Sequence, residues 1–272
     1  MYCMKGNNPG VDDRNTNAAV QPLYNLTRSD WWLHHINKCD EFPPEPGNFL
    51  ELPVNGTFTV EHAVNRAFTT TITSNPSIGT YGDGKDHPDF GLSRDGKNPG
   101  SDCISEPNMH TQNETMAAGT AFAISYTSNL AEVTPENLVV FTVLYNTPWK
   151  RLATYHVPDL PPCPPGGCIC AHGWVPNACG EPNMYMLGYR CNVTGTVASH
   201  VHRLQLPAKP PLWCELNNRE CVNGSKQMIF WNQADGNNVK VSGLDKFGFN
   251  KFPGYSMKMG YGNGAQTDIF TA

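Results

Sequence analysis

Charged residues are scarce in this chain of 272 residues, and no long apolar run is present. Asp, Glu, Lys and Arg make up 16% of the positions, and 19 basic against 24 acidic residues give a net charge of −5. Binding to a nucleic-acid backbone requires a basic field, so we expect no nucleic-acid partner. A membrane-spanning helix requires about 20 consecutive apolar residues, so we also expect no membrane segment.

The signatures of several enzyme classes are missing as well. The sequence has no Gly-x-Ser-x-Gly nucleophile elbow and no glycine-rich phosphate loop ahead of a helix. Its ten cysteines lack the paired two-residue spacing of a zinc ribbon. The even number predicts disulfides instead, and cysteines that are all oxidised exclude cysteine-based catalysis.

Glycine and proline, in contrast, are abundant, with 25 and 23 residues. Because they break helices and punctuate strands, they favour a turn-rich all-β fold. Gly, Asp and Pro crowd the segment Ser74–Ser105, which predicts a long surface loop. No repeat or linker divides the chain, so we expect one β-sandwich domain over residues 1–272. β-Branched and aromatic segments predict strands at Phe49–Leu52, Gly56–Val60, Phe68–Ile72, Thr120–Tyr126, Leu138–Leu144, Trp149–His156, Tyr185–Val193 and Gln227–Trp231.

The cysteines and glycosylation motifs indicate an extracellular protein. Disulfides form in oxidising compartments, and each stabilises a fold by on the order of 2–4 kcal/mol. Asn-x-Ser/Thr sequons agree with that environment, so we predict a secreted, extracellular glycoprotein with N-linked glycans. The number of possible pairings leaves the disulfide connectivity open. The sequons begin at Asn25, Asn55, Asn113, Asn192 and Asn223, and the cysteines are Cys3, Cys39, Cys103, Cys163, Cys168, Cys170, Cys179, Cys191, Cys214 and Cys221.

Two neighbouring segments carry a family resemblance: Pro161–Trp174, with its Cys-Pro-Pro-Gly-Gly-Cys-Ile-Cys-Ala-His-Gly-Trp run, and Asn183–Gly195. The Phe-Pro-Pro turn at 42–44, Phe49–Pro53 and Asn263–Phe270 extend it. Together they resemble the fungal lytic polysaccharide monooxygenases of auxiliary-activity family fourteen. The resemblance spans nearly the whole chain and is weakest at 65–120. It implies an immunoglobulin/fibronectin-like β-sandwich with long loops, and copper-dependent oxidation of xylan or cellulose.

The resemblance also implies a copper site. In that family a first-residue histidine supplies an amine and an imidazole, and a second histidine and an axial tyrosine complete the set. His110 occupies the place of the second histidine and Tyr185 that of the axial tyrosine, which is also the candidate catalytic residue. Glu181 and Asn183 are candidate hydrogen-bond partners of these ligands. The chain starts at Met1, so the histidine brace is incomplete in the sequence as it stands.

Two explanations of the missing histidine lead to different functions. A histidine ahead of Met1 would complete the site and make the protein a copper monooxygenase. Loss of the brace would leave a non-catalytic descendant that binds a carbohydrate, a pigment or another small molecule.

The cysteine set also departs from the family. Val64 and either Gly119 or Thr120 stand where the family has cysteines, a third is lost near Asn146, and Cys3, Cys39 and Cys179 are additional. Because Cys3 and Cys39 are both additional and both lie near the N-terminus, we hypothesise a Cys3–Cys39 bond. Separately, we expect a monomer that binds a polysaccharide or a small-molecule ligand.

Other conspicuous residues have simpler interpretations. His34 and His35 are neighbours, and neighbouring side chains point apart in a strand. His200 and His202 would share one strand face and could bind a metal, but so short a signal is typical of surface histidines. The Trp31-Trp32 pair is predicted to pack in the interior because of its apolar bulk.

Overall fold

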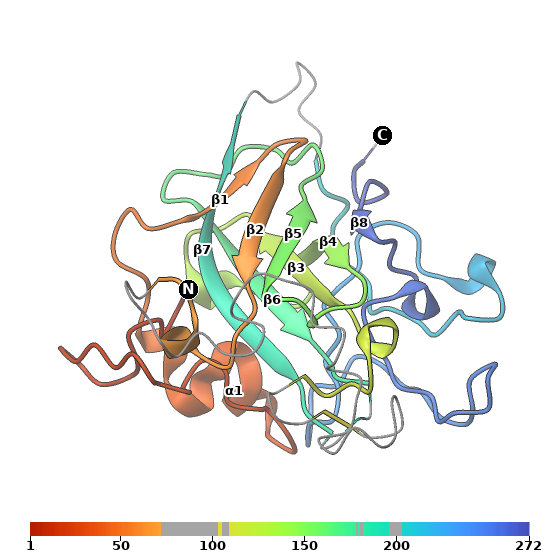
Figure 1. Cartoon of the computed structure of the whole chain (residues 1–272). Helices are drawn as coiled ribbons and strands as arrows, with labels where there is room; N and C mark the ends of the chain where they lie inside the picture. The colour runs from red at the N-terminus through yellow and green to blue at the C-terminus, as the bar shows by residue number, and fades with distance from the viewer. Residues whose placement is uncertain (72–102, 105–108, 178, 180–181, 196–202, 272) are drawn as a thin grey trace.

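A computed structural model describes the chain except for residues 72–102, 105–108, 178, 180–181, 196–202 and 272. Its main element is a six-stranded sheet, joined by a two-stranded sheet (Figure 1). In the larger sheet β1 and β7 run parallel, and every other neighbouring pair is antiparallel. The order in that sheet is β1 (Leu50–Pro53), β7 (Tyr185–Thr194), β6 (Cys168–Trp174), β3 (Thr120–Ser125), β4 (Val139–Leu144) and β8 (Gly264–Ala265). The smaller sheet pairs β2 (Thr57–Glu61) with β5 (Leu152–His156) in antiparallel fashion.

Helical structure among the described residues is confined to short turns. They are α1 (Arg28–Trp31) and the 3-10 segments η1 (Trp32–Asn37), η2 (Cys39–Glu41), η3 (Arg66–Phe68), η5 (Glu114–Met116), η6 (Leu130–Glu132), η7 (Asn218–Glu220) and η8 (Met257–Met259). The all-β sandwich predicted from the abundance of glycine and proline is confirmed.

One interior of the sandwich lies between the two sheets. In Figure 1, β2 and β5 cross in front of the larger sheet. Phe58 of β2 packs edge-on against Phe122 of β3, with ring centroids 5.0 Å apart, and stacks on Tyr155 of β5 at 5.4 Å. Phe122 also contacts Tyr155 directly, at 4.9 Å. This aromatic cluster holds the two sheets face to face.

The opposite face of the larger sheet is covered by irregular segments from both ends of the chain. Trp31 is fully buried there, 5.0 Å from the ring of Phe230, and Trp32 packs against Phe230 at 5.6 Å. The Trp31-Trp32 pair therefore packs in the interior, as predicted. Because both of its faces are covered, the middle of the sheet is buried on both sides.

Two strand predictions need correction, and one strand was missed. Residues 66–68 form a 3-10 turn and 69–71 do not form a strand, so the strand predicted at Phe68–Ile72 is wrong over its described part. Gln227–Trp231 forms only an isolated bridge, between Gln227 and Val139. Strand β6 was not predicted, because its Cys-Ile-Cys-Ala-His-Gly-Trp sequence is buried at every position and lacks the alternation of a half-exposed strand.

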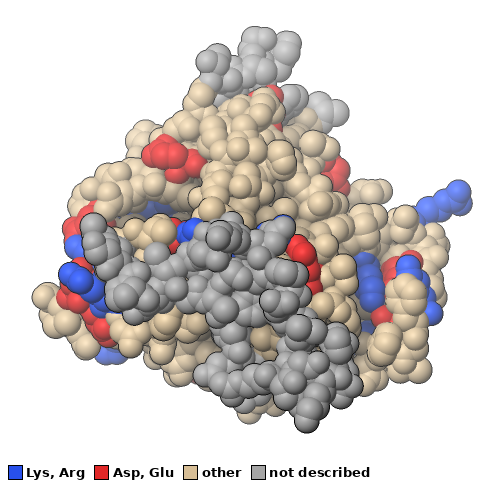
Figure 2. Space-filling model, viewed as in Figure 1, with Lys and Arg blue, Asp and Glu red and all other residues tan. Residues whose placement is uncertain are grey.

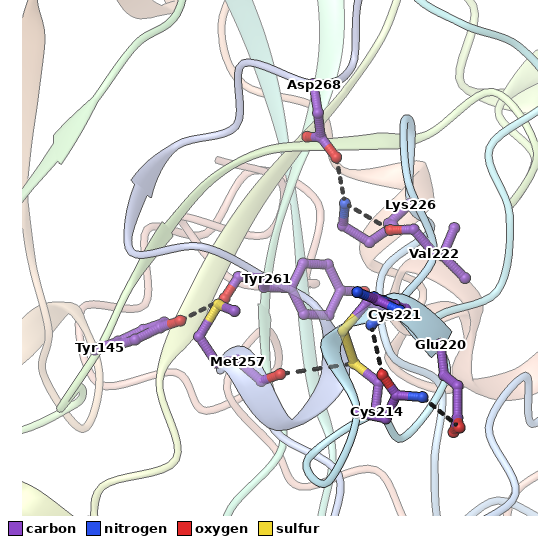
Figure 3. The surroundings of a disulfide bond; sticks show 11 residues. Tyr145, Cys214, Glu220, Cys221, Val222, Lys226, Met257, Tyr261 and Asp268 are labelled. Atoms are coloured by element: carbon purple, nitrogen blue, oxygen red, sulfur yellow. Dashed lines mark hydrogen bonds and ion pairs between the residues drawn. A yellow bond between two sulfur atoms is a disulfide. The ribbon is translucent and has the colours of Figure 1, made fainter.

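All ten cysteines form disulfides: Cys3–Cys39, Cys103–Cys179, Cys163–Cys168, Cys170–Cys191 and Cys214–Cys221. The first pair is the one hypothesised from the sequence. Near the last pair, Lys226 is buried and its ammonium group donates to the carbonyl oxygens of Val222 and Gly224 (Figure 3). The same group lies 3.0 Å from the Asp268 carboxylate, which compensates its charge.

Charged side chains are scattered on the face of the molecule drawn in Figure 2. On the face drawn in Figure 2, Lys and Arg residues are interspersed with Asp and Glu residues and gather into no large field. Within the described ranges, no helix has the length and apolar character needed to cross a membrane. The five sequon asparagines are exposed or half-buried, so a glycan on each would meet solvent.

Buried histidines make the fold sensitive to acid. Burial lowers the pKa of His34 and of His62 to about 4, and that of His172 to about 3. In the unfolded chain each has a pKa of about 6.5 and binds a proton that the folded chain rejects. Stability is therefore fully present above about pH 6.5 and falls as the pH drops toward 4, by up to roughly 3 kcal/mol for each histidine.

Urea unfolding at pH 7, 5.5 and 4 tests this prediction. His34→Gln removes one titrating group, so its free energy of unfolding should fall less between pH 7 and pH 4. His156→Gln, at an exposed position of β5, should show the same pH dependence as the unmodified protein. Equal free energies of unfolding at pH 7 and pH 4 would contradict the account.

Candidate metal centre

His110 is held in a tight loop that continues into β3. Its backbone N–H donates to the carbonyl of Ile104 at 2.8 Å, and Ile104 in turn donates to the carbonyl of Thr111 at 2.9 Å. The backbone of His110 has φ +45°, in the left-handed region that few non-glycine residues adopt. These contacts fix the direction in which the imidazole leaves the chain.

The orientation of the imidazole is set by the Cys103–Cys179 disulfide. His110 Nδ1 lies 2.7 Å from the carbonyl oxygen of Cys179. A carbonyl can only accept, so Nδ1 carries a proton, and in the neutral imidazole Nε2 then carries the lone pair. Histidines that bind metals generally donate their second N–H in this way, which fixes the tautomer and the ring plane.

The phenol of Tyr185 lies next to the His110 imidazole, although the two residues are 75 positions apart in the sequence. It is the first residue of β7 and pairs with Trp174, the last residue of β6, with the two rings stacked at 4.6 Å. Its hydroxyl lies 3.5 Å from His110 Nε2. Both side chains are buried, His110 at 6% and Tyr185 at 4% exposure. The two candidate ligands thus converge with the lone pair of His110 directed at the phenol oxygen.

This donor set fits copper in part. An imidazole nitrogen suits copper, and a weakly held phenol oxygen suits an axial position. The His110 lone pair has no carbonyl or amide partner among the described contacts, which leaves it available to a metal. In the described part of the chain, however, no three His, Cys, Asp or Glu side chains gather into a metal-binding group. The described residues therefore supply one nitrogen and one oxygen.

Nearly the whole chain matches a known protein family. The family described as Lytic polysaccharide monooxygenase AA14 matches residues 2–272. The chain belongs to the AA14 lytic polysaccharide monooxygenase family. The resemblance read from the Cys-rich segments and the C-terminal residues is thereby confirmed.

Relatives with this family name align over almost all of the chain. AA14 family lytic polysaccharide monooxygenase B of Talaromyces rugulosus is 36% identical over 283 positions, covering 99% of this chain and 90% of the relative. The B proteins of Trametes coccinea (strain BRFM310) and Pycnoporus cinnabarinus are 32% and 31% identical, each over 93% of this chain. The chain spans only 57% and 64% of these two relatives, which are longer proteins.

The AA14 chain also contains a large cavity beside the candidate centre. Its volume is about 930 Å³, and it is lined by Met1, Trp174 and Tyr185 together with the aromatic rings of Phe122 and Tyr189. A mostly apolar cavity of this size with a few polar groups is typical of a binding site for a small molecule or a peptide segment.

Several other predicted site residues lie elsewhere. Asn183 is buried, and its Nδ2 has no hydrogen-bond partner, so it is not seen to support either ligand. Glu181, His200 and His202 lie outside the described residues. His34 and His35 lie in a 3-10 segment and not in a strand; His34 is buried beside Asn37, and His35 is exposed and pairs with Asp40 at 2.8 Å.

Sequence reasoning missed two neighbouring histidines, of which His172 is buried and His62 is half-buried. His62 follows β2 and His172 lies in β6, and their rings face each other across the sandwich with centroids 5.6 Å apart. In β6, His172 shares a strand face with Cys170 and Trp174, at positions i−2 and i+2. That alternation in a buried strand is the one signal that could have identified His172, but it required knowing that β6 is a strand.

Proposed function

We propose that this chain is a secreted, glycosylated copper enzyme that oxidises xylan or xylan-coated cellulose. The observation that carries the proposal is the approach of the Tyr185 hydroxyl to His110 Nε2, between residues 75 positions apart in the sequence. Membership of the AA14 family supports the substrate class and the copper dependence. Five disulfides and five accessible sequons support an extracellular location.

His110 and Tyr185 would hold the metal, which when bound supplies oxidation of a sugar C–H bond with electrons from a reductant and with oxygen or peroxide. The Cys179 carbonyl holds a proton on His110 Nδ1, so that Nε2 would be the nitrogen that binds the metal. Trp174 stacks on Tyr185 and restricts the phenol to one orientation. Burial of both ligands limits the access of water to their donor atoms.

The remaining nitrogen donors would come from a histidine ahead of Met1. Met1 lines the same cavity as Trp174 and Tyr185, which is compatible with such a histidine. With this histidine the brace would have two imidazoles, the terminal amine and the axial phenol. This step of the proposal is tested by N-terminal sequencing of the protein from its natural source.

A second candidate function is non-catalytic binding of a carbohydrate, pigment or other small molecule. The observation that favours it is the cavity of about 930 Å³ beside a candidate centre at which the described residues bring together one imidazole and one phenol. Under this alternative the protein would bind a ligand with or without copper and release no oxidised sugar.

Assays on xylan-coated cellulose with a reductant and oxygen test the enzymatic proposal. The copper-loaded protein from its natural source should release oxidised oligosaccharides in proportion to bound copper, as measured by mass spectrometry. Tyr185→Phe keeps the ring and its stacking on Trp174 but removes the oxygen, so copper binding should persist while turnover falls by about tenfold or more. Absence of oxidised products from the copper-loaded protein would contradict the enzymatic function and favour the binding protein.

Breaking the Cys103–Cys179 bond should loosen the centre. In Cys103→Ser/Cys179→Ser the Cys179 carbonyl is no longer tied to the His110 loop, so we expect copper affinity to fall by about tenfold, in the range seen for partners of metal ligands. The double variant Cys214→Ser/Cys221→Ser is the control, because it removes a disulfide that does not contact His110. Titration calorimetry that showed equal affinity losses in both variants would disprove a specific role for Cys179.

A further inference from the structure

The strongest feature that the AA14 site leaves unused is the pair His62 and His172. Both histidines line the cavity of about 930 Å³. His62 Nδ1 and His172 Nε2 are buried, and neither has a hydrogen-bond partner. An unpaired buried polar atom is costly, so two of them beside each other require an explanation.

A chain of hydroxyl groups fixes which nitrogen of His62 carries the proton. Thr147 Oγ1 donates to the carbonyl of Leu144 at 2.6 Å, and this uses its only proton. Thr120 Oγ1, 2.6 Å from Thr147 Oγ1, must therefore donate to Thr147. Tyr155 Oη, 2.6 Å from Thr120 Oγ1, must then donate to Thr120.

The last contact in this chain involves His62 itself. His62 Nε2 lies 3.2 Å from Tyr155 Oη, whose proton is already used. His62 Nε2 therefore carries a proton and donates it to Tyr155. His62 Nδ1 is then left with a lone pair, which makes it an unpartnered base. The arrangement repeats the one at His110, where one ring nitrogen donates and the other is left as the candidate ligand.

The two rings have a separation that suits a shared ion. A zinc ion bound at about 2.0–2.1 Å lies roughly 3.2 Å from each ring centroid, so two histidines at a tetrahedral angle have centroids about 5.2 Å apart. The observed separation is 5.6 Å, with an interplanar angle of 56°. His172 is held in the central strand β6, and the backbone N–H of His62 donates to the carbonyl of Arg151 at 2.7 Å. Two anchored histidines thus lie at the separation that a shared ion would give, and each carries an unpartnered ring nitrogen.

We propose that His62 Nδ1 and His172 Nε2 form a second metal site, for a divalent ion of the zinc class, in the interior of the sandwich. Because both residues line the cavity, water can complete the coordination sphere. Among the described residues no third His, Cys, Asp or Glu joins the pair, so the protein supplies two ligands. Neither His110 nor Tyr185 belongs to this pair, so the proposal does not rest on the proposed function.

Zinc titration of the full chain carrying His110→Ala tests the proposal, because this substitution removes the candidate copper ligand. Calorimetry should show saturable binding of one zinc ion. In the same background, His62→Gln or His172→Gln should weaken binding by at least tenfold, whereas His156→Gln, at an exposed histidine next to Tyr155, should change it less than twofold. Circular dichroism and thermal unfolding establish that each variant is folded.

Two further measurements separate a metal site from a structural role. Tyr155→Phe removes the acceptor of the His62 Nε2–H, so zinc affinity should fall by about 10–100-fold although both ligands remain. Nitrogen-15 NMR of the histidine rings needs no change at His62 or His172, and zinc should shift His62 Nδ1 and His172 Nε2 while His62 Nε2 stays protonated. Failure to bind zinc, or equal weakening by His156→Gln, would overturn the proposal.

Discussion

The His110→Ala variant will lose copper affinity by at least about a hundredfold. His110 supplies the one imidazole among the described residues that faces Tyr185, with its lone pair on Nε2. Removing even a hydrogen-bond partner of a metal ligand typically costs 10–100-fold in affinity, and removing the ligand itself costs at least as much. Oxidative activity should fall with the bound copper.

Copper(II) titration of the two proteins measures this effect. The exposed His156 provides a matched control, since His156→Ala also removes an imidazole but not one near Tyr185. The control should bind copper like the unmodified protein. If His110→Ala bound copper within threefold of the unmodified protein, His110 would not be a ligand and the proposed centre would be misplaced.

The second large effect is on stability: Gly119→Ala will destabilise the fold by at least about 3 kcal/mol. Gly119 lies between the His110 loop and β3, with φ +83°, and its N–H donates to the carbonyl of Thr147 at 2.9 Å. A methyl group at this position would lie 2.3 Å from the backbone oxygen of Tyr255. The backbone must shift to relieve this contact, because no flexible side chain is there to move.

Gly10→Ala separates the clash from the cost of the left-handed backbone. Gly10 has φ +73° and no atom within 4 Å of the added methyl group, so its substitution should cost only about 1–2 kcal/mol. Urea unfolding of both variants gives the comparison. Equal losses at the two positions would show that the contact with Tyr255 is relieved at no cost.

Much of the fold was predictable because its strands follow simple patterns. Thr120–Ser125 and Val139–Leu144 are apolar, β-branched runs bounded by turns, and both form strands as expected. Burial on both faces removed the alternation that would have revealed Cys168–Trp174. At Phe68 a strand was predicted where none forms. The neighbouring residues favour a strand, but the Asn65 side chain accepts from the Ala67 N–H and begins a 3-10 turn.

The site was predictable only where a resemblance pointed to it. Nothing in the spacing of His110 and Tyr185 shows that the two residues meet, because their proximity depends on the pairing of β6 with β7 and on the Cys103–Cys179 bond. The connectivity of that disulfide could not be deduced from the number of cysteines. The His62–His172 pair depends on how two sheets pack, which no local pattern encodes.

Electron paramagnetic resonance of the copper(II)-loaded protein, beside its His110→Ala and Tyr185→Phe variants, tests the central claim most directly. We predict an axial spectrum with nitrogen couplings, loss of the imidazole coupling of His110 in His110→Ala, and an altered spectrum with retained nitrogen couplings in Tyr185→Phe. Identical spectra for all three proteins would show that copper binds elsewhere and would contradict the account.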